Sequence, residues 1–348
     1  MFILLPHFTE PSLINRKNPT RTFFCNAMAN PSILTTIHYF LAFALSTALA
    51  IKSYKKKKLT QGGAIAAFTC GVVEFSLNPF QGGGYLLAFY FLGMKASRYK
   101  NEYKKSLVFE TSEQDCEGEK TTEKIPTPRE ANNVFSTAGP ALLLTLYTCC
   151  ITPKPLTTLY GTMTPLHLAI ISCYATSLGD TLASEIGVAL GSKFRLSEGE
   201  DKCHRTTRLV VPPFRKVPSG TNGGVSVFGT FASCIGGGVI GFLAGIVGLV
   251  DGGRRFGGGE CLKEFFALLV FGVGCGFFGS MLDSFLGALC QVSYYDGKRD
   301  VIIENHSSKE KKNDDIVRVT GYNLLSNCNV NLLSVSIMTF GVYLLCPN

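Results

Sequence analysis

The chain has 348 residues, of which 46% are hydrophobic and only 17% are charged. A soluble protein carries about a quarter charged residues, so this composition excludes an ordinary soluble enzyme. The net charge is +8, but Lys and Arg act first as topology signals in a membrane protein, so we expect no nucleic-acid partner. The 13 cysteines form no C-x-x-C pair, so neither a zinc site nor a redox motif is indicated.

Eight apolar segments follow one another along the chain, most of them long enough to cross a bilayer as a helix. They cover residues 31–51, 62–78, 82–97, 134–151, 162–182, 225–250, 264–290 and 327–346. The second and third are short and flanked by glycines, which is compatible with a tight helical hairpin or with one re-entrant segment. We therefore predict an all-α fold: a polytopic membrane helix bundle of about eight transmembrane helices over 31–348, after a polar N-terminal segment over 1–30.

The Lys and Arg residues predict the orientation of these helices. Of the 33, 25 fall in the segments 52–58, 98–133, 183–224 and 291–326, which lie on one side if the eight helices alternate in direction. Because cytoplasmic loops of membrane proteins are rich in Lys and Arg, we expect these segments to face the cytosol. The expected membrane is the endoplasmic reticulum or another endomembrane, with the plastid envelope as the alternative.

Two predicted helices carry acidic and hydroxyl side chains near the ends that face the cytosol. They are Asp180, Ser184 and Glu185 in the fifth, and Ser280, Asp283 and Ser284 in the seventh. An acid in a membrane helix is costly, so it suggests a functional site. Carboxylate and hydroxyl oxygens suit Mg²⁺, and we predict that Asp180 and Asp283 hold this ion. The alternative is that both acids cap helices or pair with Arg215 or Lys216.

A glycine-rich segment precedes the sixth helix. Glycines allow successive backbone N–H groups to point into one concavity, and the helix N-terminus and the Lys216 ammonium add positive charge. We predict a loop that binds the phosphates of a nucleotide through Lys216, Ser219, Gly220, Thr221, Asn222, Gly223 and Gly224. The alternative is a flexible turn. Because the loop precedes the helix, we expect substitutions of Lys216 or Gly223 to leave helix packing intact.

Other polar residues start helices on the same predicted side. Arg129–Asn133 precedes the fourth helix, and Asn327 and Asn331 begin the eighth as supporting polar residues. The polar groups therefore converge at one membrane depth. Inside the bilayer, small residues recur every four positions in the sixth helix and in the seventh, which predicts that these two helices pack closely together.

Four motifs occur in order: SLGDTLASEIG, KVPSGTNGGVSVFGTFAS, GFFGSMLDSFLGA and NVNLLS. Together they resemble the transmembrane protein 19 family, which is related to the phytyl-phosphate kinase of plastid vitamin E recycling. The resemblance implies a multi-pass protein whose catalytic acids are Asp180, Glu185 and Asp283. It implies a kinase that uses CTP or ATP and an isoprenoid phosphate. The chain departs from the family at Ser326, which stands where an Asp is typical.

The leading hypothesis is a Mg²⁺-dependent phosphoryl transferase acting on a lipid phosphate in the bilayer. Positioning and charge neutralisation supply most of the catalysis in phosphoryl transfer, so this small set of residues would suffice. Two alternatives remain open. One is a non-enzymatic membrane scaffold or regulator, and the other is an ion-coupled carrier, because glycine-rich helix ends and intramembrane acids also occur in carriers.

Overall fold

The structure is a computed structural model of the chain. It describes residues 31–99, 108–110, 128–151, 164–191, 207–252, 258–297, 301–304 and 316–346. The predicted N-terminal segment 1–30 lies outside the described residues, and so do parts of the predicted loops 98–133, 183–224 and 291–326.

In the described part of the chain, eight helices occupy the positions of the eight predicted segments, so the predicted helical membrane fold is confirmed. They are α2 (Pro31–Lys55), α3 (Gln61–Leu77), α4 (Gly82–Arg98), α6 (Ala131–Ile151), α7 (Pro165–Gly191), α8 (Val227–Gly252), α9 (Gly258–Cys290) and α10 (Asn327–Leu345). Helix α7 continues to Gly191, past the predicted end at Leu182, because hydrogen bonding along the backbone does not stop where hydropathy falls. Consequently Ser184 and Glu185 lie on the helix.

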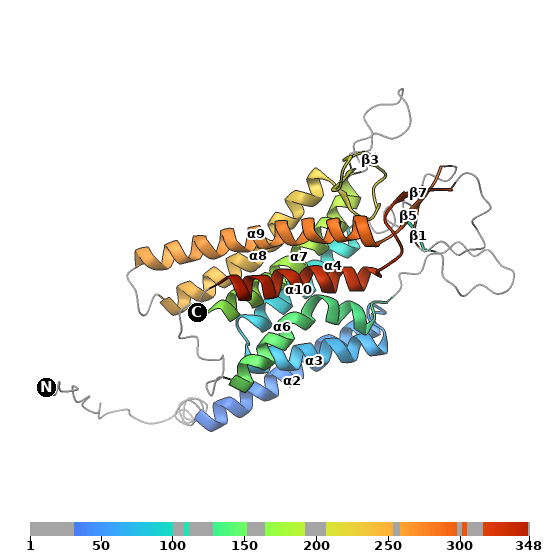
Figure 1. Ribbon diagram of the computed structural model, residues 1–348. Helices are drawn as coiled ribbons and strands as arrows, with labels where there is room; N and C mark the ends of the chain where they lie inside the picture. The colour runs from blue at the N-terminus through green and yellow to red at the C-terminus, as the bar shows by residue number, and fades with distance from the viewer. Residues whose placement is uncertain are drawn as a thin grey trace, which may run out of the picture. The chain divides into compact units, whose positions relative to one another are not determined.

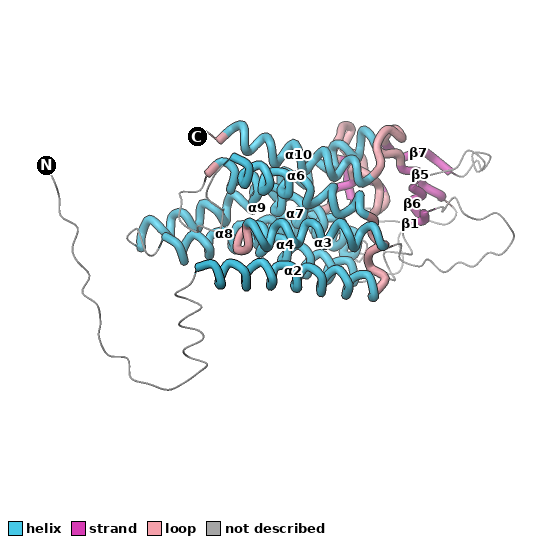
Figure 2. Tube along the Cα trace, turned by 90° about the horizontal axis from the view of Figure 1, so that it is seen from below, coloured by secondary structure: helices cyan, strands magenta, loops and turns pink. Residues whose placement is uncertain are grey.

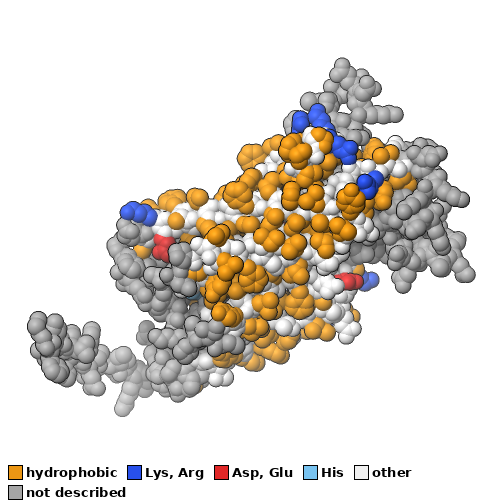
Figure 3. Space-filling model, viewed as in Figure 1, with side chains coloured by type: hydrophobic (Ala, Val, Ile, Leu, Met, Phe, Trp, Pro, Cys, Tyr) orange, Lys and Arg blue, Asp and Glu red, His pale blue; other side chains and the backbone are white. Residues whose placement is uncertain are grey.

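Four of the described helices are long and apolar enough to cross a membrane by length and composition. These are Ile33–Lys55, Val227–Leu249, Cys261–Cys290 and Asn327–Leu345. Their outward side chains are largely hydrophobic and exposed in the isolated chain, Phe231 and Phe278 among them. In Figure 3 hydrophobic side chains cover the visible faces of the helices, while the visible Lys and Arg gather at helix ends. Such a surface is stable only in contact with lipid.

The chain divides into two compact units, Met1–Leu41 and Ala42–Asn348. Of the first, the structure describes only the beginning of α2. In the second, α7 is the central helix, in contact with α4, α6, α8, α9 and α10 (Figure 1). Its side chains Ile170, Tyr174 and Leu178 are fully buried. Because α7 is surrounded by protein, polar groups on it face other helices rather than lipid.

Helices α7, α8 and α9 meet through glycines, as the small-residue pattern predicts for α8 and α9. A Cβ on Gly237 of α8 would lie 2.8 Å from the Cα of Gly276 in α9, and one on Gly236 would lie 2.8 Å from the Cα of Gly179 in α7. These distances leave no room for a side chain. The close approach aligns the polar ends of the three helices.

The described residues also form seven short strands in the segments between the helices. They are β1 (Val108–Glu110), β2 (Thr207–Leu209), β3 (Lys216–Val217), β4 (Gly224–Val225), β5 (Ser293–Asp296), β6 (Val301–Glu304) and β7 (Ile316–Thr320). Strands β1-β6-β5-β7 form one sheet, with β1 parallel to β6, and β3-β2-β4 form an antiparallel sheet. Figure 2 shows the β1-β6-β5-β7 sheet beyond one end of the helices of the second unit. The hydropathy pattern predicted only loops here.

Candidate functional site

A polar pocket of about 380 Å³ opens at the end of the helices that is predicted to face the cytosol. Its lining comes from α6, α7, α8, α9 and α10 and from the glycine-rich segment before α8. It includes every candidate site residue except Lys216: Asp180, Ser184, Glu185, Ser219, Gly220, Thr221, Asn222, Gly223, Gly224, Ser280, Asp283, Ser284, Asn327 and Asn331. Residues up to about 150 positions apart in the sequence therefore share one cavity.

Asp180 and Asp283 approach this pocket from different helices. The Oγ of Ser280 donates a hydrogen bond to Asp180 Oδ1 at 3.2 Å. The Oγ of Ser334 donates to Asp283 Oδ1 at 2.8 Å, and the side-chain nitrogen of Asn331, in its satisfied orientation, donates to the same oxygen at 3.1 Å. Both carboxylates are thus held by neutral donors.

The structure shows no ion pair between Asp180 or Asp283 and either Arg215 or Lys216, which was the alternative interpretation of these acids. A guanidinium nitrogen of Arg215 donates to the carbonyl oxygen of Val319 instead. Lys216 is exposed on strand β3, where it pairs with Arg208 of β2. Among the described residues, no ion pair neutralises Asp180 or Asp283. Two uncompensated carboxylates in one pocket suit a cationic ligand.

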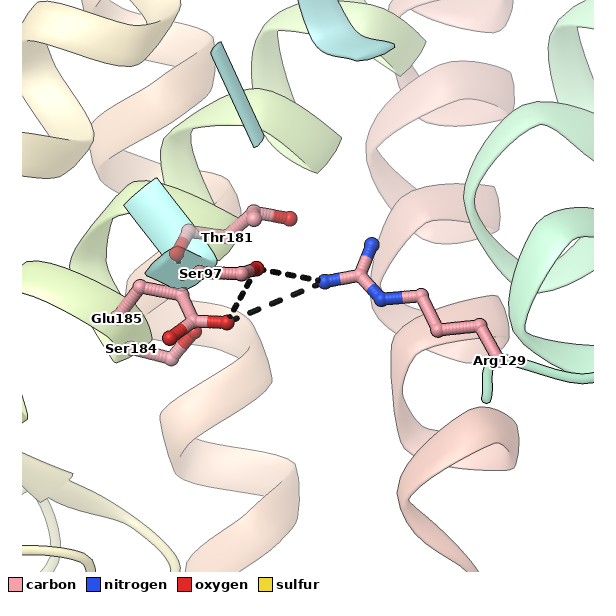
Figure 4. Close-up of polar contacts among 5 residues, drawn as sticks. All are labelled: Ser97, Arg129, Thr181, Ser184 and Glu185. Atoms are coloured by element: carbon pink, nitrogen blue, oxygen red, sulfur yellow. Dashed lines mark hydrogen bonds and ion pairs between the residues drawn. The ribbon is translucent and has the colours of Figure 1, made fainter. Parts of the chain in front are cut away.

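Among the described residues that line the pocket, Arg129 carries the positive charge. Its Nη2 lies 3.9 Å from Glu185 Oε1 and donates a hydrogen bond to Ser97 Oγ at 3.1 Å (Figure 4). The Ser97 hydroxyl in turn donates to Glu185 Oε1 at 2.7 Å. In Figure 4 Ser184 and Thr181 lie beside Glu185 on the same helix. Glu185 therefore contacts Arg129 and Ser97 at the rim of the pocket.

Backbone contacts fix the position of Arg129. Its N–H donates to the carbonyl of Lys58 at 2.9 Å, and its own carbonyl accepts from the N–H of Thr60 at 3.1 Å. Gly63 lies directly against this carbonyl, and a side chain at Gly63 would overlap it. Helix α6 begins two residues later, so the turn between α2 and α3 holds the start of α6 at the pocket.

The glycine-rich segment is a tight, hydrogen-bonded turn. Gly220 and Gly223 have positive φ angles of 92° and 76°, which non-glycine residues rarely adopt. The N–H of Asn222 donates to Ser293 Oγ at 3.0 Å, and the N–H groups of Thr221 and Gly224 donate to carbonyls within the turn. These three amides are already used inside the protein. The turn therefore shapes the pocket wall, with three of its amide groups directed to protein acceptors.

The expectation that Gly223 can be substituted without affecting helix packing is wrong. A Cβ at Gly223 would overlap the side chain of Ala288 in α9 and lie 2.6 Å from its Cα. The glycine is required by contact with a helix as well as by its φ angle. Lys216, which is exposed, meets no such restriction.

The segment Arg129–Asn133, which was expected among the converging polar groups, does line the pocket through Arg129 and Asn133. The sequence did not single out Thr137, Thr207 and Gln291, which also line it. Arg129 directly precedes α6 and Asn133 lies in its first turn, so two polar side chains stand close together in the sequence at this helix start. That signal was present in the sequence. Thr207 and Gln291 reach the pocket only through the folding of the loops.

Ser326 stands where the transmembrane protein 19 family typically has an Asp, and it caps the helix that follows it. It is the N-cap of α10, where its Oγ accepts a hydrogen bond from the N–H of Asn329 at 3.3 Å. Serine is among the preferred residues at this position. Asn327 and Asn331 lie one turn apart on α10 and are its polar residues in the pocket lining.

The oxygen-rich lining fits a magnesium ion. Asp180 and Asp283 offer carboxylates, and Ser280, Ser284 and Asn327 offer neutral oxygens. In the described part of the chain no group of three or more His, Cys, Asp and Glu could hold a metal ion by itself. Mg²⁺ is commonly held by one or two carboxylates together with substrate phosphates, so these two acids are a sufficient protein contribution.

Comparison with known proteins identifies the family. Residues 44–339 match the family described as integral membrane protein DUF92. The chain is 28% identical over 312 residues to Protein PGR of Arabidopsis thaliana, covering 88% of this chain and 96% of the relative. Uncharacterized membrane proteins of Synechocystis and Methanocaldococcus jannaschii are 27% and 25% identical, covering 72% and 73% of this chain and 82% and 84% of their own lengths. No solved structure matches the chain.

Proposed function

Because the chain belongs to the DUF92 family of integral membrane proteins, we propose that its pocket transfers a phosphoryl group from a nucleotide to a lipid phosphate. The observation that carries this proposal is the joint lining of one polar pocket by Asp180, Asp283 and Arg129 at the end of a lipid-facing helix bundle. Carboxylates for Mg²⁺ and a guanidinium for phosphate oxygens are the recurring parts of phosphoryl-transfer sites. The resemblance described above favours an isoprenoid monophosphate as the acceptor.

Each group has a distinct role in this proposal. Asp180 and Asp283 would hold Mg²⁺, and the bound ion would neutralise part of the phosphate charge. Arg129 binds phosphate oxygens through the planar fork of its guanidinium, which matches their geometry. The turn from Ser219 to Gly224 forms the wall against which the phosphates lie. Ser280 and Ser334 keep the two carboxylates in place through the hydrogen bonds described above.

The reaction leaves both products charged and needs no oxidant or reductant. An oxygen of the lipid monophosphate forms a bond to the γ-phosphorus while the bond from that phosphorus to the β-phosphate oxygen breaks. The products are a lipid diphosphate and a nucleoside diphosphate. The apolar tail of the acceptor stays in the bilayer, which the exposed hydrophobic faces of the helices contact. We place this activity in the endoplasmic reticulum or another endomembrane, with the plastid envelope as the alternative.

The test is a transfer assay with the purified full chain in detergent. Radiolabelled CTP or ATP is supplied with Mg²⁺ and a panel of isoprenoid monophosphates of different chain length, and labelled lipid diphosphate is measured. The proposal predicts labelled product that disappears with EDTA and in Asp283→Asn. If the wild type forms no labelled lipid with either nucleotide and any acceptor, the scaffold and carrier hypotheses remain.

A further inference from the structure

A second polar cluster lies deep in the bundle, away from the pocket. Its centre is Glu74 of α3, whose side chain is fully buried. The start of α3 contacts Arg129 through Gly63. Glu74 is eleven residues further along the helix, or about 16 Å at 1.5 Å per residue. This cluster is therefore near the opposite end of α3 from the pocket.

Two hydroxyl groups donate hydrogen bonds to the carboxyl oxygens of Glu74. The hydroxyl of Tyr174 in α7 donates to Glu74 Oε1 at 3.1 Å, and the hydroxyl of Thr145 in α6 donates to Oε2 at 3.2 Å. Donors that point at both oxygens stabilise a carboxylate.

The Glu74 carboxylate has no cationic side chain paired with it among the described residues, since no Lys, Arg or His there forms an ion pair with it. A buried charge without a partner is costly, and more so within a membrane. Water satisfies hydrogen bonds but does not balance the charge.

Unpartnered polar atoms occur in the segment that joins α3 to α4 and in the first turn of α4. Among the described residues the Oη of Tyr85, the Nδ2 of Asn78 and the Oε1 of Gln81 are buried without a hydrogen-bond partner. The side chains of Tyr85 and Asn78 are 0% and 2% exposed. Three unpartnered buried groups within eight residues are an exception in a folded protein, so they call for a partner that the described part of the chain does not supply.

Gly82 connects these atoms to Glu74. A Cβ on Gly82 would overlap Glu74 Oε2 and lie 3.3 Å from Asn78 Nδ2, so both groups face the space that the glycine leaves open. Tyr85 is three residues after Gly82 on the same face of α4, and its ring packs edge-on against the ring of Tyr174 with centroids 6.1 Å apart. Asn78 thus lies beside the Glu74 carboxylate, and the ring of Tyr85 lies against the ring of the tyrosine that donates to it.

We propose that Glu74 and its unpartnered neighbours bind a small monovalent cation. One carboxylate balances one positive charge, and the Glu74 carboxylate and the Tyr85 hydroxyl offer anionic and neutral oxygens of the kind that bind such ions. A half-turn of the Asn78 amide presents a further oxygen. The site is independent of the proposed phosphoryl transfer, since it shares none of the residues that line the pocket.

The experiment uses the purified full chain in detergent with Na⁺ as the probe. The unfolding temperature is measured at fixed pH in NaCl and in choline chloride of equal concentration. We expect a saturable rise of about 5 °C with Na⁺. Glu74→Gln abolishes the rise, whereas Glu264→Gln, the same change in α9 outside the cluster, retains it. Asp283→Asn also retains it, which separates this site from the pocket.

Three results would overturn the proposal. They are equal unfolding temperatures of the wild type in both salts, a Na⁺ response that persists in Glu74→Gln, and a response to pH alone, which would assign a proton instead. If Glu74→Gln does not fold, calorimetric titration of Na⁺ into the wild type decides the question. Saturable binding of one ion supports the site, and the absence of binding heat together with equal unfolding temperatures excludes it.

Discussion

Arg129 and Glu185 face each other across the rim of the pocket, with Arg129 Nη2 3.9 Å from Glu185 Oε1. The pair joins the start of α6 to the last turns of α7, and the Ser97 hydroxyl bridges them. The Arg129 side chain is 47% exposed, and such a solvent-screened pair contributes at most about 1 kcal/mol to stability. Because the ion pair contributes so little, the guanidinium can leave Glu185 and bind a phosphate at a small cost in stability.

We predict that Arg129→Ala weakens nucleotide or lipid-phosphate binding strongly and lowers transfer about 100-fold, because one positioned charge is lost from a phosphate site. Its unfolding temperature should stay within about 2 °C of the wild type, since the pair is exposed. Lys216→Ala is the matched control, as Lys216 is a cation outside the pocket. Equal losses in the two variants would contradict the assignment of Arg129.

A second prediction concerns Asp283. Asp283→Asn should abolish Mg²⁺-dependent transfer, by at least about 100-fold, while the protein still folds, because asparagine retains an acceptor for Ser334 and Asn331 but lacks the charge. Ser334→Ala should reduce activity less, since it removes one orienting hydrogen bond. Activity and Mg²⁺ dependence are measured beside the unfolding temperature. A variant that loses its fold without any change in metal dependence would assign Asp283 a structural role.

The glycine contact between α8 and α9 allows a paired test. A Cβ at Gly276 would lie 2.8 Å from the Cα of Gly237, whereas one at Gly274 would meet nothing within 4 Å. Gly276→Ala should therefore destabilise the protein by about 1–3 kcal/mol, and Gly274→Ala should be neutral or slightly stabilising. Unfolding in detergent by heat or denaturant measures both. Similar stabilities for the two variants would mean that the helices are not in close contact.

The predicted orientation can be tested with single exposed cysteines in an otherwise cysteine-free chain. A membrane-impermeant thiol reagent added from the cytosolic side should label Lys57→Cys and Lys216→Cys, which follow α2 and precede α8. It should leave Lys263→Cys, near the other end of α9, unlabelled until the membrane is opened. Labelling of position 263 from the cytosol would reverse the arrangement and place the pocket on the other side.

Hydropathy and charge predicted the helices because both are properties of neighbouring residues. A run of apolar side chains must be helical in lipid to satisfy its backbone hydrogen bonds. The distribution of Lys and Arg then fixed the relative direction of successive helices. From this it followed that Asp180 and Asp283 lie at one end, and the structure brings them into one pocket. The strands were not predicted, because their pairing joins segments far apart in the chain.

By itself the sequence determined the number and order of the helices, the small-residue contact of α8 with α9 and the gathering of the acids at one end. Only the tertiary structure decided that Arg129, rather than Lys216, reaches the pocket, and that Gly223 is required by its contact with Ala288. The same holds for the hydroxyls that surround Glu74. The physical reason is that helix formation depends on local hydrogen bonds, whereas the neighbours of a side chain depend on how separate helices and loops pack.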